Sequence, residues 1–255
     1  MSVIDSRERF SDRVADYVRF RPGYPPGLVT TLLEGGVDPA SLRAADIGSG
    51  TGIFTRLLLE RGVTVTGVEP NANMRAAAES WLQPFEKFTS LGGTAENTGL
   101  EKAGFDLVTA AQAFHWFHNM RTRAEFARIL KPEGRLALIW NRRRLSDPLQ
   151  RSYDALLREL APEYGKVNHL TLDDDEIGQF FATGKMTLSC FDNRQQLDFE
   201  GLLGRLRSAS YCPSEDSREY SALVAKLQQL FSRHAIDGVV RFAYDSHLYL
   251  GPVAR

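Results

Sequence analysis

The sequence predicts an α/β fold with a doubly wound, mostly parallel sheet. Two observations carry this prediction. Short apolar runs alternate with longer amphipathic runs between residues 28 and 141, and a loop with three glycines directly follows one of the short runs. Repeating strand and helix units of this kind place helices on both faces of a parallel sheet.

The elements before the first strand are expected to be helical. Residues 5–18 place apolar side chains at helical spacing, and this helix should stop before Pro22 because the residue that precedes a proline avoids the helical region. A segment rich in proline and glycine follows at 21–27, and 28–33 form a second helix. The alternating region then predicts strands at 44–47, 63–68, 88–91, 105–110 and 135–140, with helices at 51–61, 72–81 and 121–130.

The alternation stops after Asn141. Helices are expected at 147–161, 173–182, 201–210 and 215–234, and extended runs at 186–191 and 239–250. The extended runs should complete the same sheet while the helices around them form a cap. We therefore expect one domain over 1–255, with a ligand-binding core at 28–141 and a helical cap with substrate-side elements from 1–27 and 145–235.

Composition indicates a globular protein. Hydrophobic residues make up 43% of the chain and charged residues 25%, which is an ordinary globular balance. No apolar run approaches the ~18 residues that span a bilayer, and the first 20 residues carry charges throughout, unlike a signal peptide. These features lead us to expect a soluble cytoplasmic protein with no membrane partner.

Charge and cysteine content exclude further classes. The net charge is −1 and neither half of the chain is strongly basic, so no nucleic-acid partner is expected. Cys190 and Cys212 are too few for a disulfide framework or a four-cysteine zinc site. His115 and His118 have a spacing that suits a metal on a helix, but no third ligand is identifiable, so no metal is expected.

The glycine loop "ADIGSGTGIF" predicts a nucleoside-type ligand. Gly48, Gly50 and Gly52 occur where a strand turns into a helix, and glycine there permits positive φ and close approach of a ligand to the backbone. A dinucleotide fingerprint would need its third glycine at position 53, which is Ile53. Glu69 ends the next strand, where a carboxylate can accept both ribose hydroxyls. The alternative is that the glycines form a tight turn without a ligand and that Glu69 is only a solvated residue. The occurrence of the glycine loop and Glu69 in one strand–helix–strand unit disfavours this alternative.

These stretches resemble the class I S-adenosylmethionine-dependent methyltransferases. The resemblance runs through "DIGSGTG", "GVEP", "GTAENTGL" and "FDLVTAAQAFHWF". The N-terminal "FSDRVADYVRFRPGYP" is similar to a small-molecule subgroup, the type 11 methyltransferases that include trans-aconitate methyltransferase-like proteins. The resemblance is good over residues 10–141, and it implies a Rossmann-like seven-stranded sheet with an antiparallel strand near the C-terminus.

The resemblance also implies the cofactor, S-adenosyl-L-methionine, and the product S-adenosyl-L-homocysteine. Tyr17 and Arg21 would close over the methionine end, Glu69 would hold the ribose, and Met74 would pack on the adenine. The cofactor-binding residues that it implies are Tyr17, Arg21, Asp46, Gly48, Ser49, Gly50, Gly52, Glu69, Pro70, Met74, Ala95, Glu96, Ala111 and Gln112.

Acceptor-binding candidates lie at the same sheet edge. His115 and Trp116 follow the fourth strand of the alternating region, where ligands of such sheets bind. His115 could act as a donor or a general base, although a carboxylate acceptor needs no base; packing under the next helix is the alternative. Further candidates are Tyr24, Arg142, Arg205 and Tyr211, with a solvated turn or an ordinary amphipathic helix as alternatives for the arginines. Arg205 and Arg207 are two apart on a helix, so at most one should face the pocket.

The sequence thus predicts methyl transfer to a small molecule, with a carboxylic acid as a candidate acceptor. A methyltransferase acting on a protein or RNA, and a non-catalytic S-adenosylmethionine-binding protein, remain alternatives, because the motifs concern the cofactor rather than the acceptor. A nicotinamide-dependent oxidoreductase is disfavoured by the glycine spacing. The chain is expected to be a monomer or a homodimer.

Overall fold

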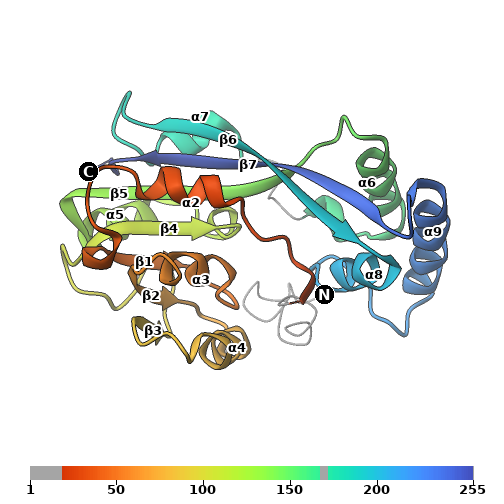
Figure 1. Cartoon of the computed structure of the whole chain (residues 1–255), viewed down its shortest axis with the longest axis horizontal. Helices are drawn as coiled ribbons and strands as arrows, with labels where there is room; N and C mark the ends of the chain where they lie inside the picture. The colour runs from red at the N-terminus through yellow and green to blue at the C-terminus, as the bar shows by residue number, and fades with distance from the viewer. Residues whose placement is uncertain (1–18, 167–171, 255) are drawn as a thin grey trace.

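The structure, a computed structural model, describes residues 19–166 and 172–254 and is built on one mixed sheet (Figure 1). Seven strands follow the order β3-β2-β1-β4-β5-β7-β6. β7 is antiparallel to both of its neighbours, and the remaining pairs are parallel. The strands are β1 (Arg43–Ile47), β2 (Thr64–Val68), β3 (Phe88–Leu91), β4 (Phe105–Ala111), β5 (Leu130–Arg143), β6 (Thr187–Leu197) and β7 (Val240–Gly251). The predicted fold class is confirmed.

The helices of the described chain occur where the periodicity predicts them. They are α2 (Pro26–Leu33), α3 (Ile53–Leu59), α4 (Ala72–Leu82), α5 (Met120–Ile129), α6 (Pro148–Leu160), α7 (Asp174–Gly178), α8 (Phe199–Arg207) and α9 (Arg218–His234). The helix predicted at 173–182 is shorter than expected, although Asp173 and Glu176 start it with a capping box. The helix predicted at 5–18 lies outside the described residues.

β6 is longer than the predicted run at 186–191. Its second half is polar, and its burial alternates between exposed and intermediate positions along most of the strand. It pairs with β7 on one side only, at the edge of the sheet. An edge strand with this exposure needs few apolar residues, so hydrophobicity alone does not reveal its length.

Separate hydrophobic clusters fill the two faces of the sheet and the cap. Ala44 and Ala45 are neighbours on β1, yet they belong to different clusters, because successive strand residues face opposite sides. A third cluster joins α6, α8 and α9 to the first half of β7. In Figure 1 these three helices gather at one end of the molecule, around the ends of the long strands β6 and β7. We call these three helices, with the turn after α8, the cap.

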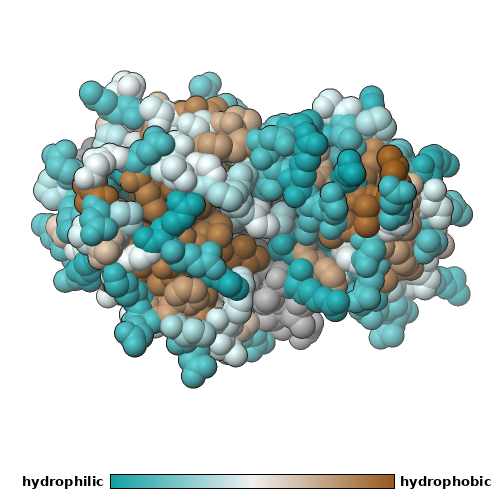
Figure 2. All heavy atoms as spheres, in the orientation of Figure 1, coloured by the Kyte–Doolittle hydropathy of each residue, from teal (hydrophilic) through white to brown (hydrophobic). Residues whose placement is uncertain are grey.

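Hydrophobic atoms do not form one continuous surface on the face that Figure 2 shows. They gather over the sheet half and, separately, over the cap, with hydrophilic residues between and around them. No helix in the described ranges is long and apolar enough to cross a bilayer.

Candidate active site

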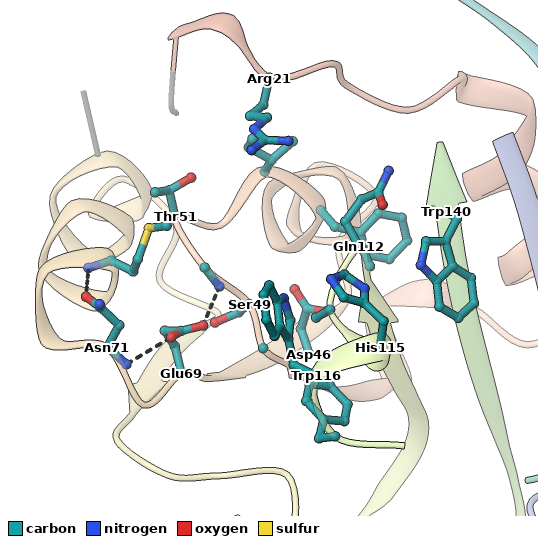
Figure 3. Close-up of a pocket in the computed structure, with 18 of the residues that line it drawn as sticks. Arg21, Asp46, Ser49, Thr51, Glu69, Asn71, Gln112, His115, Trp116 and Trp140 are labelled. Carbon is teal, nitrogen blue, oxygen red and sulfur yellow. Dashed lines mark hydrogen bonds between the residues drawn. The ribbon is translucent and has the colours of Figure 1, made fainter. Parts of the chain in front are cut away.

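A cavity of about 320 Å³ lies at the carboxyl ends of β1, β2, β4 and β5. Ligands of open α/β sheets bind at this edge. Its wall is formed by the glycine loop, the end of β2, the loop between β3 and β4, the turn after β4, the end of β5, the segment before α2 and the cap. Figure 3 shows Glu69 and Asn71 on one side of it, with Gln112 and Trp140 on the other.

The three glycines of the loop all have positive φ, but for different reasons. A Cβ on Gly48 would lie 2.7 Å from the Cβ of Ala113, and a Cβ on Gly52 would lie 2.7 Å from Cδ1 of Leu82. A Cβ on Gly50 would meet nothing within 4 Å, and Gly50 lines the cavity. Gly52 is not among the lining residues. The absence of a side chain at Gly52 allows close packing between α3 and α4, and its contact with a ligand stays a prediction.

Thr51 is a lining residue that sequence reasoning missed. Thr51 is 1% exposed, and its Oγ1 has no hydrogen-bond partner in the described part of the chain. A buried hydroxyl without a partner is costly unless a ligand or water completes it. Its place inside the glycine motif was the available signal. Ser49, predicted from the same loop, also lines the cavity.

Glu69 is held rigidly beside the glycine loop. Its Oε2 accepts a hydrogen bond from the Gly50 amide at 3.0 Å, and its Oε1 accepts one from the Asn71 amide at 2.9 Å (Figure 3). Arg75 donates to the carbonyls of Glu69 and Pro70 at 2.8 and 3.0 Å. Burial raises the pKa of Glu69. Each oxygen keeps a lone pair that can accept a further hydrogen bond.

Asn71, also missed, sets the start of α4. Its side-chain Oδ1 accepts from the amides of Asn73 and Met74 at 3.0 Å each, the geometry of an N-cap. The cap fixes Met74, which lines the cavity and is 3% exposed. An asparagine directly before a helix pattern was the signal for this role.

Asp46 is a deeply buried lining residue at the end of β1. Its two carboxylate oxygens accept hydrogen bonds from the hydroxyls of Thr55, at 2.6 Å, and Thr109, at 2.7 Å. Burial outweighs these bonds and raises the pKa of Asp46 to about 6.

The loop after β3 brings Ala95 and Glu96 to the cavity. Helix α5 fixes this loop: the Glu125 carboxylate accepts from the Thr98 amide at 3.0 Å and from Arg128 at 2.7 Å. Asn119 also donates to the Glu96 carboxylate at 2.9 Å. Contacts with α5 therefore hold Ala95 and Glu96 in the cavity wall.

The end of β4 and the turn after it carry four predicted residues, and all four line the cavity. Ala111 ends the strand. Gln112 follows with a left-handed φ of 55°, and its side-chain amide donates to the Asn141 carbonyl at 3.1 Å. His115 is buried in a short 3-10 helix, with its ring centroid 4.8 Å from that of Trp116. Trp116 is 37% exposed.

The segment before α2 is tied down across one side of the cavity. The Gly23 carbonyl accepts from the side-chain amides of Asn141, at 3.0 Å, and Asn193, at 2.9 Å. Arg21 donates to the Ser208 carbonyl at 2.8 Å, and the Tyr24 ring packs edge-on against Phe54. Arg21 and Tyr24 both line the cavity. Tyr17, predicted to act with Arg21, lies outside the described residues.

The cap, together with parts of β5 and β7, supplies the remaining wall, which we call the cap wall. Arg205 and Tyr211 line the cavity as predicted, and Arg207 instead donates to the Tyr220 hydroxyl at 2.9 Å. Arg142 also lines it but donates to the Tyr249 hydroxyl at 2.9 Å and contacts the Asp174 carboxylate at 3.4 Å. Sequence reasoning missed three further lining residues of this wall, Arg143, Ser210 and Tyr244.

Comparison with known proteins agrees with this architecture. A family model described as a methyltransferase domain matches residues 45–138. A protein of Mycobacterium tuberculosis named as an uncharacterized methyltransferase is 32% identical over 227 residues, covering 88% of this chain and 86% of the relative. A solved structure provisionally named a type II methyltransferase, from Anaeromyxobacter dehalogenans, has a TM-score of 0.63 at 23% identity and covers 91% of this chain and 98% of its own.

A second solved structure contains ligands. It is a phosphoethanolamine N-methyltransferase of Haemonchus contortus in complex with phosphomonomethylethanolamine and S-adenosylhomocysteine, with a TM-score of 0.58 at 16% identity over 100% of this chain and 62% of that one. At this identity the likeness concerns the fold. The sequence relatives and the fold together define the class: the chain belongs to the class I S-adenosylmethionine-dependent methyltransferases.

Proposed function

We propose that this protein transfers a methyl group from S-adenosyl-L-methionine to a small molecule bound in the cavity described above. The observation that carries the proposal is that a single cavity is shared by the glycine loop, which suits the cofactor, and by the cap, which suits a second molecule. Its volume of about 320 Å³ lies in the range of small-molecule sites, which begins at ~300 Å³.

The residues of the loop side fit the cofactor. Thr51 offers a buried hydroxyl without a partner among the described residues, and Gly50 leaves open space in front of its backbone. Glu69 would hold the ribose hydroxyls, since its carboxylate is fixed by two backbone amides and retains free lone pairs. Asp46, Met74, Ala95, Glu96 and Gln112 are proposed as further cofactor contacts. The cofactor supplies an electrophilic methyl carbon with a built-in leaving group.

The protein's own contribution would be mainly positioning. Holding two reactants in line supplies ~7–11 kcal/mol of barrier reduction in favourable cases. His115 and Trp116 lie between the glycine loop and β5 and would orient the acceptor. A base role for His115 is required only if the acceptor atom starts protonated. A carboxylate oxygen as the methylated atom would need no proton transfer. The arginines that line the cap end of the cavity favour an acceptor that carries an anionic group.

The test is S-adenosylhomocysteine release with a cell extract divided into small-molecule and macromolecular fractions. The proposal predicts release with the small-molecule fraction. Release confined to the macromolecular fraction would indicate a protein or RNA acceptor. Binding of S-adenosylmethionine without release in either fraction would indicate a non-catalytic binding protein.

A further inference from the structure

The cap wall of the cavity carries a buried positive charge that no described carboxylate balances. Arg205 on α8 is 6% exposed and lines the cavity. Its Nε has no hydrogen-bond partner in the described ranges, and the ionisable groups that act on its guanidinium are the phenols of Tyr153, Tyr211 and Tyr244. A buried cation ordinarily requires a paired anion.

Aromatic rings around Arg205 compensate only in part. Its guanidinium carbon lies 5.8 Å from the ring centroid of Phe242 and 5.5 Å from that of Tyr244. Such cation–π contacts are individually weak, whereas the cost of removing a charged group from water is much larger. The rings therefore orient the guanidinium without replacing a counter-ion.

Arg143 adds a second guanidinium to the same wall. Its side chain is 7% exposed, and it pairs with Asp154 at 3.1 Å and contacts the Tyr164 hydroxyl through the same Nη2. Its Nη1 is buried and has no partner among the described residues. Asp154 is shared with Arg158 at 2.7 Å. The interior of this wall thus has an excess of positive charge and unused N–H donors.

We propose that Arg205, with Arg143, Tyr211 and Tyr244, binds an anionic group of the methyl acceptor, a carboxylate or a phosphate. The inference rests on the proposed function, because it assigns the acceptor's place in the same cavity. A guanidinium offers parallel N–H donors that match two oxygens of either anion. The bound anion supplies the counter-charge that the described residues do not provide, and the Tyr211 hydroxyl supplies a further donor. The Tyr244 hydroxyl donates to Gln195 at 3.3 Å, so Tyr244 contributes its ring beside the guanidinium.

The distribution of charge over the cavity agrees with this assignment. Asp46 and Glu69 belong to the ends of β1 and β2, whereas Arg205 belongs to the cap, at the far end of the molecule from β2 in Figure 1. A cationic sulfonium is favoured near the carboxylates and an anion near the guanidinium groups.

The anionic group that Arg205 binds is not the group that receives the methyl. Hydrogen bonds from a guanidinium engage the oxygen lone pairs and make them weaker nucleophiles. The acceptor therefore carries at least two functional groups, one held by the cap wall and one presented to the methyl group. Its methylated product keeps the negative charge.

The direct test is calorimetric titration of the S-adenosylhomocysteine-loaded protein with malonate and, separately, with inorganic phosphate. Wild type should bind at least one of them, and Arg205→Met should bind it at least tenfold more weakly. Arg207→Met is the matched control on the same helix and should bind like wild type. The stronger of the two probes indicates whether the natural group is a carboxylate or a phosphate. Equal binding by Arg205→Met, or no binding by wild type, overturns the inference.

Two further measurements distinguish an anion-binding role of Arg205 from a structural role and from loss of the cofactor site. All three proteins should bind S-adenosylhomocysteine equally; failure of wild type to bind it would contradict the proposed function rather than this inference. Without anion, Arg205→Met should melt at the same or a higher temperature than wild type, because an unbalanced buried charge has been removed. A lower melting temperature combined with unchanged anion binding assigns Arg205 a purely structural role. If Arg205→Met does not fold, Arg205→Lys is used, and its point charge should bind several-fold more weakly.

Labelled methyl donor tests the position of the methylated atom. With the small-molecule fraction of an extract as acceptor, the labelled product should be retained on an anion-exchange resin at neutral pH. A labelled product that flows through the resin contradicts a remaining anionic group.

Discussion

Asp46 combines burial with a place in the cavity wall, and both affect its ionisation. Its oxygens accept two threonine hydroxyls, yet burial still raises its pKa from 3.8 to about 6. The folded protein without ligand therefore binds a proton at Asp46 more tightly than the unfolded chain does. Stability from this group is fully present below pH 3.8 and is lost as the pH rises through about 6.

Asp46→Asn should remove this pH dependence. Between pH 5 and pH 7, the free energy of unfolding of wild type should fall by about 1 kcal/mol relative to the variant, since a difference of one pKa unit corresponds to 1.36 kcal/mol. Urea titrations of both proteins at the two pH values measure the difference. If the difference in free energy of unfolding between wild type and Asp46→Asn stays constant with pH, Asp46 has an ordinary pKa.

Among the elements, helix α5 holds the loop that brings Ala95 and Glu96 to the cavity wall. Hydrogen bonding to Arg128, against opposing burial and with help from Thr98, lowers the pKa of Glu125 to about 2. A lowered carboxyl pKa contributes stability that is present above the unfolded value and lost as the pH falls toward the folded value.

Glu125→Gln should lower the free energy of unfolding by about 2 kcal/mol at neutral pH, because hydrogen bonds to a charged group contribute about 1.5–3 kcal/mol each before compensation. The matched control is Glu133→Gln, since Glu133 is exposed. The difference between wild type and Glu125→Gln should shrink as the pH falls from 4.5 through about 2. Equal stability of both variants at pH 7 would contradict the role given to Glu125.

The contact between α8 and the segment before α2 links the cap to the cavity. A Cβ on Gly204 would lie 2.1 Å from Cδ2 of Phe20, and Phe20 directly precedes Arg21. The side-chain amide of Gln195 also donates to the Phe20 carbonyl at 2.9 Å. Any displacement of Phe20 therefore also moves Arg21, which lines the cavity.

Gly204→Ala should weaken S-adenosylhomocysteine binding several-fold and lower the free energy of unfolding by about 1–3 kcal/mol, the usual cost of overpacking, despite the better helix propensity of alanine. Gly178→Ala is the control, because a Cβ there meets nothing within 4 Å. Calorimetry and urea unfolding measure the two effects. Unchanged affinity would show that the position of Phe20 does not affect the cofactor site.

For the whole molecule, local patterns predicted the sheet core and the cofactor side of the cavity. Short apolar runs indicated the strands and period-3.6 hydrophobicity indicated the helices. The glycine loop and Glu69 are also close together in the sequence. The cap wall is different. Arg143 and Tyr244 face each other because β5 and β7 pair antiparallel in that register, and no local pattern connects residues so far apart.

Strand alternation explains why Arg143 rather than Arg142 faces the cap. The three arginines after Asn141 point in different directions and form ion pairs with different carboxylates. The pairs are Arg142 with Asp174, Arg143 with Asp154, and Arg144 with Asp192 and Asp245. The sequence shows three equivalent residues. The register of the sheet, which tertiary structure fixes, distinguishes them.

Calorimetric titration with S-adenosylhomocysteine measures whether the glycine loop and Glu69 together hold the cofactor. Wild type should bind one molecule per chain. Glu69→Ala should bind at least about tenfold more weakly, since each lost hydrogen bond to the carboxylate contributes about 1.5–3 kcal/mol before compensation, while Glu79→Ala, at an exposed position on α4, should bind like wild type. Affinity of a folded Glu69→Ala variant within twofold of wild type would show that Glu69 does not hold the cofactor.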